Sequence, residues 1–223
     1  MSQSPFAVAS PAKSVLATNK LIRNTYTLLS ATLLFSAVTA GLSMYLNSPP
    51  MGVLITLGGY FGLLFLTNRL RNSAWGILSV FALTGFMGLT LGPMVNMYVH
   101  TFSNGTELVM LALGGTGAIF LGLSGYALTT RKDFSFMGGF IMVGILIAFL
   151  AGIGALIFQI PALSLAVSAM FILLMSGLIL YQTSAMVHGG ETNYIMATIT
   201  LYVIIYNLFT SLLHLLGAFS GKD

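Results

Sequence analysis

This 223-residue chain has no cysteine and very little charge. Without cysteine it can form neither disulfides nor cysteine-based metal sites, and its redox compartment cannot be read from the sequence. Charged residues make up 5% of the chain, whereas a typical soluble domain is about 25% charged. Four acids and eight bases cannot give a chain of this size the polar surface that water requires. The composition therefore excludes a water-soluble class and indicates a protein that lives in lipid.

Hydrophobic residues, 57% of the chain, gather in seven apolar stretches separated by short loops. A helix of about 20 apolar residues crosses a hydrocarbon layer of about 30 Å. We therefore predict an all-α integral membrane protein with a seven-helix membrane domain over residues 26–219 and a polar cytoplasmic tail over residues 1–25. Pro93 lies inside the third stretch, where it frees a carbonyl one turn earlier and predicts a kink near Leu89. The predicted spans are 26–46, 51–67, 74–99, 108–130, 136–158, 161–181 and 194–219.

The basic residues predict the orientation of the chain. If the N-terminus is cytoplasmic, only Lys222 falls on the far side, which is a strong excess of positive charge inside. We expect a cytoplasmic N-terminus and a C-terminus on the opposite face. The basic residues are spread over loops without a dense patch, so the net charge of +4 gives no indication of a nucleic-acid partner. The seven residues on the near side are Lys13, Lys20, Arg23, Arg69, Arg71, Arg131 and Lys132.

Several spans carry Gly or Ala at four-residue steps, which lets helix backbones approach closely in lipid. The steps serve either the packing of one bundle or the seam of a homo-oligomer, and we favour internal packing. Whether the chain forms a homo-oligomer is left open. No internal repeat indicates an inverted-repeat transporter. The steps are Gly58 with Gly62, Gly88 with Gly92, and Gly144 with Ala148 and Gly152.

Ionisable groups inside a membrane are costly and usually functional, and this chain has almost none there. Its acids fall in predicted loops or at the chain end, and no histidine spacing suits a metal. The sequence therefore lacks the groups of an intramembrane hydrolase or a carboxylate proton pump, and we expect no enzyme activity, metal or cofactor. The four acids are Glu107, Asp133, Glu191 and Asp223.

The last span carries polar residues on one helical stripe. The stripe either lines a polar cavity or hydrogen-bonds to neighbouring helices. We favour hydrogen bonding for Thr200 and Ser211, and both readings stay open for Asn207. Tyr202 and Tyr206 are expected to lie away from the stripe, whose members are Thr200, Asn207, Ser211 and His214.

Histidines near the helix ends offer weaker candidates. His214 lies toward the outer end of its span and could titrate near neutral pH, although a wetted helix end is the commoner case. His188 and Glu191 flank two glycines, and two ligands are too few for a metal site. Asn104 begins a sequence that matches the glycosylation motif, which matters only in a secretory pathway.

Three segments together resemble a known family. Residues 128–136, with Arg131, Lys132 and Asp133, resemble the basic-Asp-Phe-Ser loop of the Bax inhibitor-1 family. Residues 180–183 resemble the end of that family's sixth helix, and residues 201–209 resemble its seventh. Within the family, residues 188–194, which contain His188 and Glu191, and residues 23–26 resemble the proteobacterial YccA branch.

The resemblance implies a bundle in which six helices surround the seventh. For the family at large it also implies a pH-dependent calcium leak that depends on two aspartates, on helices six and seven, and on a basic residue ending helix two. Here these positions read Gln182, Ile204 and Arg69. Because Ca²⁺ takes six to eight oxygen ligands, often carboxylates, the missing acids argue against conduction.

For the YccA branch, the resemblance implies a bacterial inner-membrane protein that is a partner, substrate and modulator of the membrane-bound ATP-dependent protease FtsH. An interaction protein of this kind is our first hypothesis, and the polar tail would offer the protease something to grip. The second is a cation leak that uses Asn207, Gln182 and Arg69 in place of carboxylates. The third is a small-solute transporter.

Overall fold

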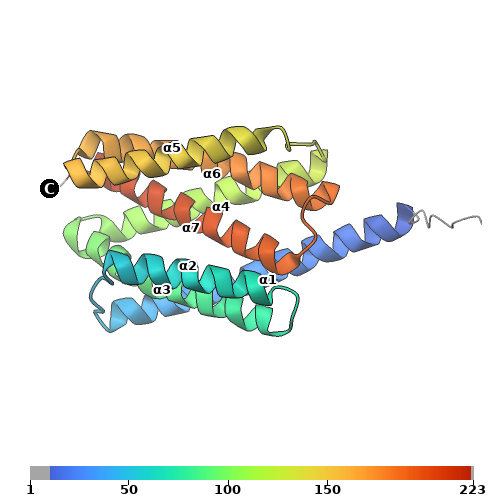
Figure 1. The fold of residues 1–223 in the computed structure, drawn as a ribbon. Coiled ribbons are helices and arrows are strands. Elements are labelled where there is room, and N and C mark those ends of the chain that lie inside the picture. Colours follow the sequence, from blue (N-terminus) through green and yellow to red (C-terminus); the bar gives the residue numbers. More distant parts are fainter. Residues whose placement is uncertain (1–10, 222–223) are drawn as a thin grey trace, which may run out of the picture.

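The structure, a computed structural model, describes residues 11–221, with side chains from residue 16 onward. Within that range the chain forms seven α-helices joined by short loops (Figure 1). Each helix is long and apolar enough to cross a membrane, which confirms the predicted fold class. The helices are α1 Pro11–Tyr45, α2 Val53–Leu70, α3 Trp75–Thr101, α4 Gly105–Thr130, α5 Met137–Phe158, α6 Pro161–His188 and α7 Tyr194–Phe219.

Two helices extend well beyond their predicted spans. Helix α1 begins at Pro11, so residues 11–25 of the expected tail are helical, and residues 1–10 lie outside the described residues. Helix α6 continues past its predicted end at residue 181 to His188. Hydropathy detects only the part of a helix that lies in lipid, whereas polar residues that form good helices extend it further. At 35 residues, α1 is about 52 Å long, and its first turns project beyond the other helices (Figure 1).

Helix α7 occupies the centre of the bundle, where it contacts α1, α3, α4 and α6 (Figure 1). The main contacts of α2 are with α3, and those of α5 are with α6. The expected arrangement around the seventh helix therefore consists of four close neighbours and two outer helices. This central position explains why the buried side chains of α7 are more numerous than those of the outer helices.

Glycines bring α1 and α3 into close contact. A Cβ atom added to Gly92 would lie 2.7 Å from the carbonyl oxygen of Ala40, and one added to Gly88 would collide with the backbone of Ser36. These two glycines therefore serve internal packing, as expected. By contrast, added Cβ atoms at Gly58 and Gly62 on α2 would meet nothing within 4 Å, so that pair faces outward.

The turn between α6 and α7 is fixed by two local devices. Gly189 has a φ of 80°, a left-handed conformation that glycine adopts at helix ends without penalty. The next two backbone N–H groups, of Gly190 and Glu191, both donate to the carbonyl of Ala185. Asn193 then caps α7 by accepting hydrogen bonds from the N–H groups of Ile195 and Met196. The turn therefore delivers α7 into the centre of the bundle at a defined position.

Candidate functional site

Tyr202 is a buried polar residue that contacts two other helices. Its side chain is 2% exposed, and its hydroxyl donates to the carbonyl of Thr84 on α3 at 3.2 Å. The same oxygen lies 2.6 Å from Ser36 Oγ on α1. Because the single hydroxyl proton of Tyr202 goes to Thr84, Ser36 is the donor in the second bond. One tyrosine therefore joins α7 to both α1 and α3.

From the sequence we expected Tyr202 to lie away from the polar stripe of the last span. The signal that could have found it lies on α1, whose buried hydroxyl residues follow a helical repeat. A hydroxyl stripe on one apolar helix calls for a hydrogen-bonding partner on another. The buried members of that stripe are Thr25, Thr32, Ser36 and Ser43.

Further polar contacts attach other parts of α7 to its neighbours. Near its start, the Thr198 hydroxyl lies 3.3 Å from the carbonyl of Thr25 on α1. Near its end, His214 Nδ1 lies 2.7 Å from Ser168 Oγ on α6. His214 is half-buried and hydrogen-bonded to another helix. The shorter hydrogen bond of Thr198, 2.7 Å, goes to a carbonyl one turn earlier in its own helix. Tyr202 and His214 are therefore the residues that hold the central helix to its neighbours.

Thr200 and Asn207 share one environment, which differs from the interhelical hydrogen bonding that we favoured for Thr200. Both line a cavity of about 580 Å³ that is bordered by α2, α3, α5 and α6 and has α7 as its floor. The side-chain amide of Asn207 donates to the carbonyl of Val203 in its own helix at 2.8 Å. The cavity lining is mostly apolar, so Thr200 and Asn207 are two of the few polar residues that border it.

Gln182 occupies one of the positions where the resemblance expects an aspartate. It is 6% exposed, and its Nε2 atom is buried without a hydrogen-bond partner among the described residues. The adjacent Thr183 joins a hydroxyl chain to Ser124 Oγ at 3.2 Å, and Ser124 in turn contacts the hydroxyl of Tyr26. An unpartnered buried amide costs about 1–3 kcal/mol. Gln182 is therefore the least satisfied polar group of α6.

The second position, Ile204, is 1% exposed within the apolar core. Arg69, the predicted basic member of the same set, lies exposed in the last turn of α2. The structure therefore buries Gln182 and Ile204 but leaves Arg69 outside the core. In the range from residue 16 to 221, no group of three His, Asp or Glu side chains could hold a metal ion.

The loop between α4 and α5 is fixed to the end of α6 through Ser184. Its hydroxyl accepts a hydrogen bond from the N–H of Phe134 at 3.0 Å and donates to the carbonyl of Lys132 at 3.2 Å. The imidazole of His188 donates through Nδ1 to the carbonyl of Ser184 at 2.9 Å. His188 therefore closes the last turn of α6.

The two acids of these loops stabilise their own turns. Asp133 accepts the N–H of Ser135 at 2.8 Å, and this bond holds the pKa of the Asp133 carboxyl below its usual range. Glu191 Oε1 accepts the N–H groups of Thr192 and Asn193 at 2.8 and 2.7 Å. Both carboxylates are thus engaged with backbone amides.

The neighbouring loop from α2 to α3 is joined to the same end of the bundle. The side-chain amide of Asn193 donates to the carbonyl of Arg71 at 3.1 Å and to Asn72 Oδ1 at 2.9 Å. The residues of the resemblance thus hold together three loops at one end of the molecule. The contacts observed for them join loops and helix ends to one another.

These features define a seven-helix membrane bundle whose central helix is held to its neighbours by hydrogen bonds of Tyr202 and His214. A sequence model of the family described as "Inhibitor of apoptosis-promoting Bax1" matches residues 18–221. The chain therefore belongs to the Bax inhibitor-1 family.

Bacterial relatives match nearly the whole chain. An uncharacterised protein of Pseudomonas aeruginosa is 54% identical over 203 residues, covering 91% of each chain. The Escherichia coli K12 protein named "Modulator of FtsH protease YccA" is 50% identical over 210 residues, covering 94% of each chain. A protein of E. coli O6:H1 with the same identity and coverage is named "Inner membrane protein YccA". The predicted family and its YccA branch are both supported by these matches.

Proposed function

We propose that this protein is an inner-membrane partner, substrate and modulator of an FtsH-type ATP-dependent protease, and that it acts by binding rather than by catalysis. The observation that carries the proposal is the 50% identity over 94% of both chains to the E. coli protein named as a modulator of that protease. The match covers 210 of the 223 residues, so it is not confined to one short motif.

The proposal includes an orientation with the N-terminus in the cytoplasm, based on the seven-to-one distribution of basic residues. A membrane protease that uses ATP pulls from the cytoplasm, so it would grip the chain at residues 1–10, which precede α1. Reporter fusions test the orientation. A fusion at Asp223 is expected to report the periplasm, and a cytoplasmic signal there would contradict the proposal.

The mechanism combines a grip with resistance to extraction. Pulling on α1 must separate it from α3 at Gly88 and Gly92 and break the bond between Ser36 and Tyr202. The protein would therefore be engaged readily and extracted slowly. While it occupies the protease, other membrane substrates are spared.

The test is the half-life of the full-length chain and of a chain lacking residues 1–10, each in cells with and without FtsH. The truncation leaves every residue of α1 to α7 in place. We expect FtsH to degrade the full-length protein faster than the truncated one, and the truncated protein to protect a second FtsH substrate for longer. If both forms decay at one rate that does not depend on FtsH, the proposal fails.

A further inference from the structure

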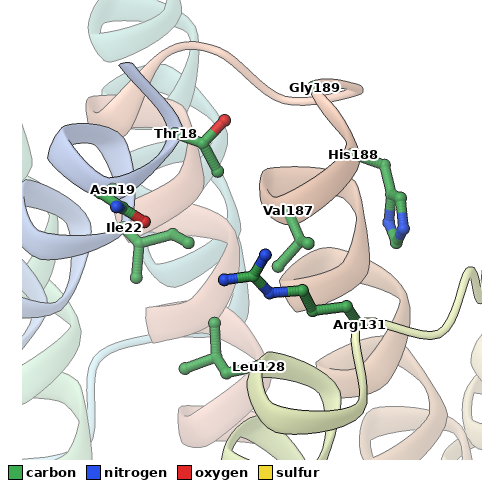
Figure 2. A pocket seen from close by; sticks show the side chains of 8 residues that line it. All are labelled: Thr18, Asn19, Ile22, Leu128, Arg131, Val187, His188 and Gly189. Atoms are coloured by element: carbon green, nitrogen blue, oxygen red, sulfur yellow. The ribbon is translucent and has the colours of Figure 1, made fainter. Parts of the chain in front are cut away.

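A cavity of about 480 Å³ lies between α1, α4 and α6, at the end of the bundle where α4 and α6 terminate (Figure 2). Its walls are the first described turns of α1 and the last turns of the other two helices. In a membrane this level is the boundary between hydrocarbon and headgroups. A ligand in the cavity would therefore sit at the depth of lipid phosphates.

The side chain of Arg131 extends into this space toward Ile22 and Val187 (Figure 2). No carboxylate is among the residues that line the cavity. The two acids in the adjoining loops, Asp133 and Glu191, accept backbone N–H groups instead. A guanidinium carries five donors in a planar fork that fits phosphate oxygens.

The lining is divided in the way an amphipathic ligand requires. Thr18 and Asn19 supply polar groups from one turn of α1, while Ile22 lies one turn further along the helix. Leu128 lies one turn before the end of α4 and is also apolar. A lining that combines polar and apolar groups suits a phosphate joined to a glycerol and its acyl chains.

We propose that this cavity binds a phosphate group through Arg131, and that its source is the headgroup of an anionic phospholipid. Basic pockets between membrane helices on one face of a membrane bind such headgroups in general. Free inorganic phosphate offers the same chemistry, but it would make no use of Ile22 and Leu128. This inference is independent of the proposed protease partner.

The positive charge of Arg131 offsets the negative ends of two helices. Helices α4 and α6 both end there, and each C-terminus carries about half a negative charge. Without the guanidinium these two ends would repel an anion. Removing this one side chain should therefore weaken binding strongly.

The experiment measures lipid binding by native mass spectrometry of the full chain from neutral detergent micelles. Phosphatidylglycerol, phosphatidylcholine and inorganic phosphate are the probes. The variants are Arg131→Gln and, as a matched control, Lys132→Gln, because the Lys132 ammonium lies 3.3 Å from the Tyr126 hydroxyl, outside the cavity. Glutamine is preferred to glycine at position 131 because the φ of 50° there would make glycine stabilising in itself.

We expect phosphatidylglycerol to bind the unmodified protein and Lys132→Gln alike. Arg131→Gln should weaken binding at least about tenfold, which corresponds to losing one charge-assisted contact. Arg131→Lys keeps the charge without the planar fork, so its affinity should lie between those of the unmodified protein and Arg131→Gln. It replaces Arg131→Gln in the test if that variant does not fold. Competition by millimolar inorganic phosphate alone, with no preference for the lipid, would overturn the lipid source. Equal binding by all forms, or equal binding of phosphatidylcholine, would overturn the site.

Discussion

Ser43 Oγ donates a hydrogen bond of 3.0 Å to the carbonyl of Leu89. This is the carbonyl that Pro93, four residues later, leaves without its helical N–H donor. A hydroxyl on α1 therefore satisfies the backbone group that a proline on α3 sets free. The proline is tolerated inside α3 because the neighbouring helix supplies the missing donor.

This relationship predicts a coupling between Ser43 and Pro93. Ser43→Ala should lower the free energy of unfolding in detergent by about 0.6–1.5 kcal/mol. In a Pro93→Ala background the same substitution should cost close to nothing, because the new alanine has a backbone N–H that can donate to Leu89. Denaturant titration of the two single variants and the double variant gives the interaction energy. Equal costs of Ser43→Ala in both backgrounds would contradict the coupling.

The contact between α1 and α3 predicts opposite responses at two glycines of similar sequence context. Gly92→Ala should destabilise the bundle by about 1–3 kcal/mol because its new methyl group meets the Ala40 carbonyl. Gly62→Ala is the control, since its Cβ would meet nothing within 4 Å. It should be neutral or stabilise the helix by up to about 1 kcal/mol. Thermal unfolding followed by circular dichroism separates the two, and similar losses would be inconsistent with this packing.

Tyr202 and Tyr206 offer a second matched pair. Tyr202→Phe removes the bonds to Ser36 and Thr84 and should cost about 1–2 kcal/mol of unfolding free energy. The Tyr206 hydroxyl lies 3.5 Å from Thr90 Oγ1, so Tyr206→Phe should cost less than about 0.5 kcal/mol because so long a contact is weak. Ser36→Ala should add little to Tyr202→Phe. An additive double variant would show that the tyrosine does not act through Ser36.

The positions of Gln182 and Ile204 predict low calcium conduction. Both are buried and neither is ionisable, so no carboxylate there attracts Ca²⁺. Proteoliposomes of the unmodified protein should show calcium flux close to that of protein-free liposomes between about pH 6 and 8, the range in which histidine titrates. Gln182→Asp combined with Ile204→Asp should raise the flux if the double variant stays folded. Strong flux through the unmodified protein would favour a channel instead.

The candidate site was only partly predictable, and Gln182 and Arg69 illustrate why. Both were assigned to a polar core by their place in the sequence, yet one is buried and the other is exposed in the last turn of α2. Helical spacing identifies which residues share a face, but not what that face contacts. Tyr202 was missed for the same reason, since its partners are more than 100 residues away in the chain.

The sequence by itself determined that the helices are suited to lipid, how many helices form and to which family the chain belongs. Hydropathy and the scarcity of charge are properties of each segment alone, so they need no knowledge of neighbouring helices. Only the tertiary structure decided that Gly92 packs against α1 while Gly62 faces outward, and that Tyr202 rather than Thr200 joins the helices. In lipid the outside of a bundle is as apolar as its inside, so hydrophobicity cannot distinguish a surface from a core. That distinction is made by shape and hydrogen bonding between helices, which exist only once the chain has folded.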